Sequence, residues 1–303
     1  MPIPRTSGHS VISLLEVVLR PMGTDGVHAR TALFETVLAH LSAFITRHRE
    51  PGTETFTFPP VMSRAQLEAS GYLKSFPHLL GCVSGLHGDE ADVQALVGGR
   101  MNGSAWTEAL AATDVVLTPA ACYPLYPLVA ANGAVPGHGA FFDVESYCFR
   151  REVSTEPGRL QSFRMREFVC IGSPRAAQEF RRRLLERAES MMLDLALPYR
   201  IASASDPFFG RVGRIMALDQ VERALKFELL VPLAPEEPPV ACMSFNYHQD
   251  HFGKTWRLRT DDGAEAHTAC VAFGVERLCI ALFALYGLEP REWPASTRAA
   301  LSI

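Results

Sequence analysis

Two strand-like segments separated by a turn-rich loop constrain the fold of this chain more than any other feature. Residues 141–154 read FFDVESYCFRREVS and residues 163–173 read FRMREFVCIGS, and both patterns favour strands. The loop STEPGRLQS that connects them is rich in turn-forming residues. Strands joined in this way pair antiparallel, so this region predicts a hairpin with a long tip.

The rest of the chain alternates short strands with longer helices. Helical spacing at 29–50 is followed by a strand-like stretch at 54–63, a short helix at 63–70 and a strand at 113–118. Ser173 and Pro174 supply an N-cap and a first-turn proline for a helix that reaches about Leu195. Residues 221–233 fit a helix or a strand, 240–248 a strand, and 270–287 a strand that becomes an apolar helix. We expect one α+β domain over residues 1–303, an antiparallel sheet flanked by helices.

Composition limits the cellular setting and the partners. The seven cysteines are widely spaced without a CxxC pair, which indicates a reducing, cytoplasmic compartment. No apolar run is long enough to cross a membrane. The net charge of −4 gives no sign of the basic face that a tRNA-binding protein needs.

Three short motifs together resemble those of class II aminoacyl-tRNA synthetases. FRRE at 149–152 and RMREF at 164–168, separated by the loop, resemble motif 2. GVER at 274–277 resembles motif 3, and Pro59-Pro60 after an amphipathic helix resembles motif 1. Each motif is weak alone, but their order and the elements between them make the resemblance specific.

The resemblance implies an ATP site, and the chemistry suits it. A fixed guanidinium at Arg150 would bridge the substrate carboxylate and the α-phosphate and stabilise charge in the transition state. Arg277, also expected to be catalytic, would sandwich adenine with Phe168, while Glu152 contacts the amino edge of the base. Further ATP contacts are expected from the loop and the neighbouring strands: Arg159, Leu160, Arg164, Lys226 and Ser244.

A narrower resemblance covers about residues 30–290. The segments TPAACYPLYP, LALPYRIASASDPFFG and LKFELLVPL are similar to seryl-tRNA synthetase catalytic domains, without their N-terminal tRNA-binding arm. Cys122, Glu167 and Cys270 match the zinc ligands of the archaeal-type seryl enzymes and of the amino acid:[carrier protein] ligases. Zinc would keep one position open for a free α-amino group. Taken without the resemblance, the cysteines fit buried core residues and Glu167 fits an ion pair equally well.

The implied reaction is zinc-dependent, ATP-driven activation of a small amino acid, glycine or alanine, with Mg²⁺ accompanying ATP. Ser244 and Asn246 are candidate substrate contacts, and serine remains possible through them. The glutamate usual in this region of the synthetases is replaced by Val240 or Ala241, which puts the Mg²⁺ contact in question. His248, Asp250 and His251 fit a polar loop over the pocket better than a second metal site.

Three functions remain, and they differ in the molecule that would receive the activated amino acid. A holo carrier protein thiol is favoured, with the arginine-rich helix 175–195 as a hypothetical docking face or simply a solvated surface. The alternatives are a seryl-type synthetase that loads tRNA and an inactive paralogue that binds a partner as a regulator. The resemblance also implies a homodimer through motif 1.

Overall fold

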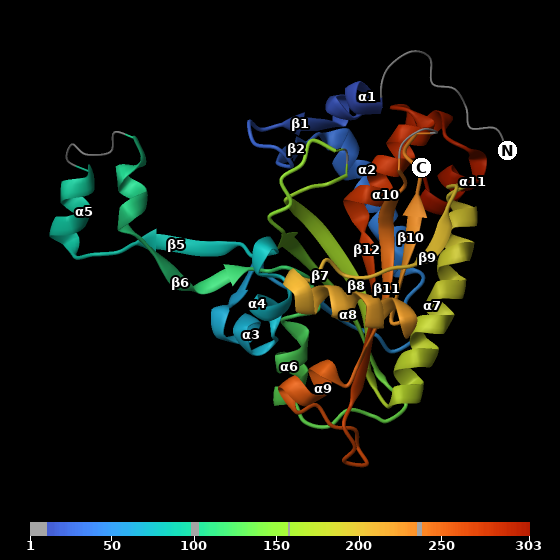
Figure 1. The fold of residues 1–303 in the computed structure, drawn as a ribbon. Coiled ribbons are helices and arrows are strands. Elements are labelled where there is room, and N and C mark those ends of the chain that lie inside the picture. Colours follow the sequence, from blue (N-terminus) through green and yellow to red (C-terminus); the bar gives the residue numbers. More distant parts are fainter. Residues whose placement is uncertain (1–10, 98–102, 157, 235–237) are drawn as a thin grey trace.

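A mixed sheet forms the centre of the protein. The structure, a computed structural model, describes residues 11–97, 103–156, 158–234 and 238–303. Its largest sheet has seven strands in the order β3 (Glu54–Thr57), β7 (Ala140–Phe149), β8 (Ser162–Gly172), β12 (His267–Gly274), β11 (Val240–Gln249), β10 (Lys226–Val231) and β9 (Arg200–Ser203) (Figure 1). Neighbouring strands are antiparallel except for the parallel pair β3–β7. The expected α+β fold is confirmed, with this one parallel edge added.

The predicted hairpin is present and lies within the sheet. Strands β7 and β8 pair from Ala140 opposite Ile171 to Phe149 opposite Ser162, and residues 150–161 form the long loop. The helix after β8 is α7 (Pro174–Asp194), and the Ser173 hydroxyl accepts a hydrogen bond from the Ala176 N–H at its start. This satisfies one of the free N–H groups of the first turn.

Helices cover the two faces of the sheet unequally. One face packs against α1 (Val11–Val18), α2 (Ala32–Thr46), α7, α10 (Val275–Tyr286) and α11 (Ala295–Leu301), and this is the larger core. The opposite face is covered in part by α6 (Leu125–Ala131) and α9 (His251–Trp256). A long stretch of this second face therefore remains free for a cavity.

Smaller elements surround this body. Strands β1 (Leu19–Pro21) and β2 (His28–Arg30) form a hairpin, and β4 (Val61–Ser63), β6 (Leu110–Leu117) and β5 (Cys82–Leu86) form a second sheet. Strands β5 and β6 extend away from the body as an arm that carries α5 (Glu90–Val97) and the 3₁₀ helix Gly103–Ala109 (Figure 1). Three short helical turns, α3 (Arg64–Ala69), α4 (Tyr72–Ser75) and the 3₁₀ helix Pro77–Leu79, connect β4 to the arm, and a further 3₁₀ turn, Pro290–Glu292, precedes α11.

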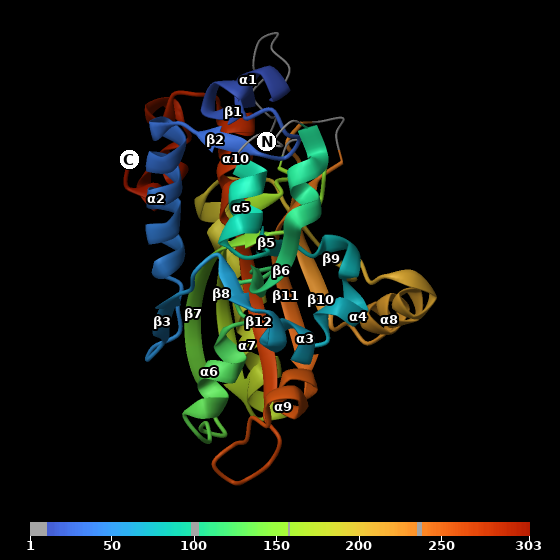
Figure 2. The same cartoon turned by 90° about the vertical axis from the view of Figure 1, so that its left-hand side faces the viewer.

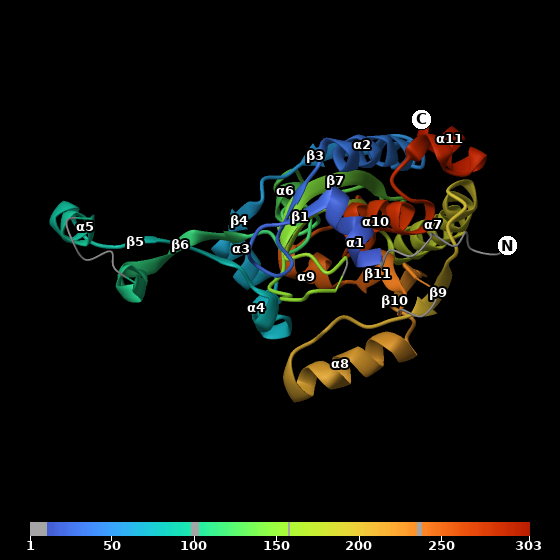
Figure 3. The same cartoon turned by 90° about the horizontal axis from the view of Figure 1, so that it is seen from above.

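Helix α8 (Gly210–Glu222) stands apart from the sheet (Figure 3). Only Val221 and Glu222 of the segment 221–233, which fitted a helix or a strand, belong to α8. Residues Lys226–Val231 form β10, so the strand reading is right for most of the segment. Among the helices that the structure describes, none is long and apolar enough to cross a membrane.

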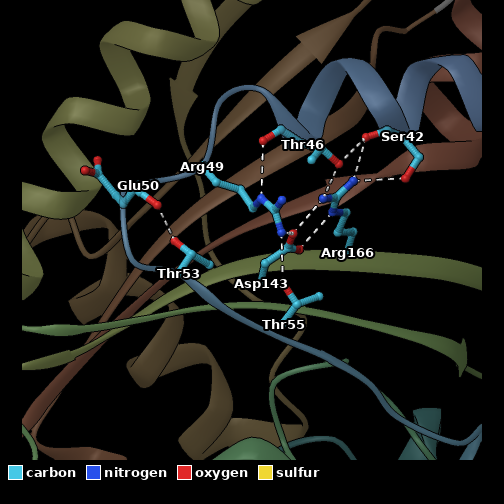
Figure 4. Close-up of polar contacts among 8 residues, drawn as sticks. All are labelled: Ser42, Thr46, Arg49, Glu50, Thr53, Thr55, Asp143 and Arg166. Atoms are coloured by element: carbon cyan, nitrogen blue, oxygen red, sulfur yellow. Dashed lines mark hydrogen bonds and ion pairs between the residues drawn. The ribbon is translucent and has the colours of Figure 1, made fainter.

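A buried ion-pair network holds α2 against β7 and β8 (Figure 4). The Arg166 guanidinium donates to both carboxylate oxygens of Asp143, at 2.8 and 2.6 Å, and to oxygens of Ser42 and Thr46 on α2. Arg49 approaches the same carboxylate from the outside at 3.3 Å. Figure 2 shows α2 running beside the edge of the sheet that this network secures.

Candidate active site

The alternation of side chains along the strands builds the site on the free face of the sheet. Successive residues of a strand point to opposite faces, and residues paired across strands share a face. Ser244 of β11 pairs with Ala272 of β12, which in turn pairs with Glu167 of β8. Cys270 pairs with Asn246 in the same way, and all these residues line one cavity.

Cys122, Glu167 and Cys270 meet at the bottom of this cavity. Their two sulfur atoms and a carboxylate oxygen lie within 4.8 Å of one another, and all three side chains are buried. Cys122 comes from the turn before α6, where its backbone N–H donates to Glu167 Oε1 at 3.0 Å. Two thiols and one carboxylate at this spacing are a donor set that fits zinc and leaves a fourth position open. No second cluster of this kind occurs among the described residues.

The surroundings of the three groups contain polar contacts to sulfur. Asn246 Nδ2 donates to Cys270 Sγ at 3.4 Å, and His248 Nε2 lies 3.7 Å from the same sulfur. Burial lowers the pKa of His248 to about 4, so its imidazole is neutral at neutral pH. Contact with Cys270 acts to lower the pKa of Cys122, but burial and Glu167 raise it to about 11. These pKa shifts of His248 and Cys122 are those of the protein groups alone, with no cation bound beside them.

The nearby polar residues do not form a second metal site. Asp250 pairs with Lys254, and His251 Nε2 lies 3.2 Å from the Ser70 carbonyl oxygen. Of the three candidates in this region only His248 lines the cavity.

Two half-buried guanidinium groups flank the other half of the cavity. Arg150 Nε donates to the Pro119 carbonyl at 3.0 Å, and Arg277 donates to the carbonyls of Gly158 and Ala241 at 2.8 and 3.0 Å. Within the described part of the chain, neither group forms an ion pair. Burial lowers the pKa of Arg277, which reflects the cost of holding a cation there. Partly buried cations whose hydrogen bonds go to neutral carbonyls make a site for an anion.

The structure corrects two ATP contacts expected from motif 2. Arg164 and Phe168 point to the opposite face of the sheet, because they differ by an odd number of residues from Glu167 on β8. Arg164 is ion-paired with Glu35 and Glu276, and Phe168 packs edge-on against Phe273 in the large core. Neither side chain can contact a ligand in the cavity.

Phe163 occupies the position that was expected of Phe168. It shares the cavity face with Glu167, and its ring centroid lies 5.7 Å from the guanidinium carbon of Arg150. Phe163 lies four residues before Glu167, so the alternation of side chains along a strand places both on the same face.

Of the other predicted ATP contacts, some line the cavity and others are already paired with protein carboxylates. Glu152 and Leu160 line the cavity, whereas the partly exposed Arg159 pairs with Glu156 and Glu152 on the loop. The Lys226 ammonium lies 2.7 Å from Asp206 and 3.0 Å from Glu228, so two carboxylates already neutralise it.

Ser244 and Asn246 hydrogen-bond to each other at 3.1 Å beside the cavity. Glu228 pairs with Ser244 across β10 and β11 and also lines the cavity. A carboxylate therefore faces this region although Val240 and Ala241 lack one. The pairing of the two strands is needed to find it.

Comparisons with known proteins agree with this geometry. No family model matches the chain. Two proteins of Bradyrhizobium diazoefficiens, amino acid–[acyl-carrier-protein] ligases 1 and 2, are 55% and 56% identical to it, over 96% of this chain and 89% and 87% of theirs. A type-2 serine–tRNA ligase of Methanopyrus kandleri is 28% identical over 87% of this chain and 53% of its own.

The solved structures bear on the fold. The M. kandleri seryl-tRNA synthetase, solved in complex with a tRNA, superimposes with a TM-score of 0.82 at 23% identity, over the whole of this chain and 61% of that one. The fold is thus that of a seryl-tRNA synthetase catalytic domain, which confirms the resemblance carried by the motifs. On the identity and coverage of the Bradyrhizobium proteins, the chain belongs to the amino acid–[acyl-carrier-protein] ligase family and is a ligase.

Proposed function

We propose that this ligase activates a small amino acid with ATP in a zinc-dependent reaction and transfers it to the phosphopantetheine thiol of a carrier protein. The observation that carries the proposal is the division of one cavity into two halves. A Cys–Glu–Cys set occupies one half, and two half-buried guanidinium groups, without ion pairs to any described residue, occupy the other.

The guanidinium half suits ATP. Phe163 and Arg277 would take the two faces of adenine, with Glu152 near its amino edge. Arg150 would then bridge the α-phosphate and the substrate carboxylate, whose oxygen attacks phosphorus and displaces pyrophosphate. A cation fixed before the reaction stabilises the developing charge without reorganisation.

The thiol and carboxylate half suits the amino group. Zinc held by Cys122, Glu167 and Cys270 would supply an open Lewis-acid position for a free amine. Asn246, through its bond to Cys270 sulfur, would orient that ligand. The rings of Tyr123, which follows Cys122 in the chain, and Phe252 line the same cavity with their centroids 5.7 Å apart, and aromatic walls beside the metal ligands would favour the small side chain of glycine or alanine.

Glu228 and Ser244 supply the contact that the sequence lacked for Mg²⁺. Both line the cavity and are paired across two strands. Oxygen ligands of this kind, completed by phosphate oxygens, suit Mg²⁺.

The second step forms a thioester. The phosphopantetheine sulfur would attack the carbonyl carbon of the aminoacyl-adenylate, AMP would leave with the bonding electrons, and the thiol proton would pass to solvent. Carrier-protein acceptors are named for the Bradyrhizobium relatives, and the acidic balance of this chain favours a protein over a tRNA.

Helix α8 fits the acceptor better than α7, where docking was first expected. Three arginines of α7 bind within the protein: Arg181 to the Ala224 carbonyl, and Arg183 and Arg187 to Glu50. Helix α8 instead exposes apolar side chains, with Val212 at 70%, together with basic ones. The exposed set is Phe209, Arg211, Val212, Arg214, Ile215 and Leu218. An apolar face with arginines suits a small acidic carrier protein.

Two further features are part of the proposal. The exposed edge strand β3 beside α2 is the part of the fold that would pair in a homodimer. A reducing, cytoplasmic setting would suit the seven cysteines, which are widely spaced without a CxxC pair.

Amino-acid-dependent exchange of labelled pyrophosphate into ATP tests the activation step. We expect exchange with glycine or alanine, and none after removal of zinc or in Cys122→Ala. Exchange that survives both changes would refute the role of the metal half. Absence of exchange with any amino acid would favour an inactive paralogue.

A further inference from the structure

Helix α8 is anchored to the body mainly by a single polar side chain. Gly213 is its one buried residue, and most of its other side chains are exposed. Gln220 Nε2 donates to Asp206 Oδ2 at 2.8 Å, and the Asp206 backbone N–H donates to Gln220 Oε1 at 2.7 Å. Among the described residues, this pair of hydrogen bonds is the polar contact by which an α8 side chain reaches a residue that lines the cavity.

Asp206 connects this clamp to the cavity wall. Its second oxygen, Oδ1, lies 2.7 Å from Lys226 Nζ, and Lys226 in turn contacts Glu228. Burial acts to lower the pKa of Lys226, but the two carboxylates outweigh it and the pKa is raised. The ammonium is therefore charged, and Asp206 fixes where that charge lies.

The loop that carries Asp206 is held at its other end by aromatic packing. Phe208 stacks on Phe76 with ring centroids 5.0 Å apart, and the Phe209 N–H donates to the Ser75 carbonyl at 2.8 Å. Phe76 and Pro207 both line the cavity. One end of the loop thus rests on α4, whereas the other depends on α8 through Gln220.

We propose that Gln220 is a positioning residue for the reaction. It fixes the Asp206 carboxylate, and through it the Lys226 ammonium, beside Asn246, with which Lys226 pairs across β10 and β11, although Gln220 lies on the outer helix. This inference rests on the proposed function, because it assigns the side of the cavity that holds Asn246 and Cys270 to the amino acid.

The clamp also links the outer helix to the cavity energetically. Anything that shifts α8 pulls on Asp206, so binding on the helix and binding in the cavity affect each other to the same extent. Gln220 makes one hydrogen bond to the charged Asp206 carboxylate and one to the Asp206 backbone N–H. Loss of such bonds weakens ligand binding in the cavity by about tenfold or more.

Pyrophosphate exchange without any carrier protein tests the proposal, because the docking step is then absent. In Gln220→Ala we expect the KM for the amino acid to rise about tenfold while the KM for ATP stays unchanged. Gln220→Glu, which places a carboxylate opposite Asp206, should raise the KM for the amino acid at least as much. A general loss of structure would change both constants, so the split identifies positioning.

Asp219→Ala is the matched control. Asp219 is the neighbouring residue of α8, and its carboxylate pairs with Arg223 on the exposed side. We expect its KM for the amino acid to equal that of the wild type. If Gln220→Ala behaves like Asp219→Ala, or raises both KM values equally, the positioning role is overturned. If the wild-type protein itself performs no exchange, the proposed function fails and this inference fails with it.

Discussion

Replacing Asp143 with alanine should destabilise the protein strongly although the residue lies outside the cavity. The change removes the one carboxylate that binds the Arg166 guanidinium, whose side chain is only 6% exposed. Arg166 would keep its contacts to Ser42 and Thr46, but these oxygens are neutral. A buried cation would then lack its counter-charge.

The expected cost follows from that geometry. Breaking a buried, hydrogen-bonded ion pair by removing one partner costs about 3–5 kcal/mol. The two short bonds between Arg166 and Asp143 place this pair in that range. The outer contact from the more exposed Arg49 adds at most about 1 kcal/mol.

Urea unfolding followed by circular dichroism measures the effect. With a slope of about 3 kcal/mol/M, the midpoint should fall by about 1–1.7 M. The control is Glu186→Ala, which breaks an ion pair with Arg182 whose side chains are 59% and 63% exposed, and should cost below about 0.5 kcal/mol. The apolar double variant Asp143→Leu, Arg166→Met should cost less than Asp143→Ala alone. A cost below about 1 kcal/mol for Asp143→Ala would refute the account of the network.

Three further predictions concern the cavity and α8. Phe163→Ala should raise the KM for ATP in pyrophosphate exchange with little loss of stability, whereas Phe168→Ala should cost about 3–5 kcal/mol in urea unfolding; the reverse pattern would contradict the strand assignment. Cys270→Ala should reduce bound zinc from one per chain to none by elemental analysis, and retained zinc would exclude this set of ligands. Ile215→Asp should impair transfer to a carrier protein but leave pyrophosphate exchange intact, and equal transfer rates would remove α8 as the docking surface.

Elements with strong local patterns could be predicted from the sequence. The hairpin, the Ser173-capped helix and the strand that becomes α10 each combine a clear periodicity with a cap or turn signal. Cys122, Glu167 and Cys270 came from the family resemblance, and their convergence in one cavity agrees with it.

What the sequence did not reveal depends on register and on packing. Phe168 was chosen by counting within a motif, but the face on which a strand residue lies is set by alternation relative to Glu167. Glu228 was identified as a cavity residue only from its pairing with Ser244 across β10 and β11. Helix α8 buries only Gly213 and exposes its apolar side chains, so its apolar spacing does not correspond to a face packed on the core.

The identity of the acceptor tests the central claim most directly. The protein would be incubated with ATP and radiolabelled glycine or alanine and then offered, separately, holo carrier protein, apo carrier protein and total tRNA. The account predicts label on the holo carrier protein alone, in a bond that hydroxylamine cleaves as it does a thioester. Label on tRNA, or equal label on the apo carrier protein, would contradict it.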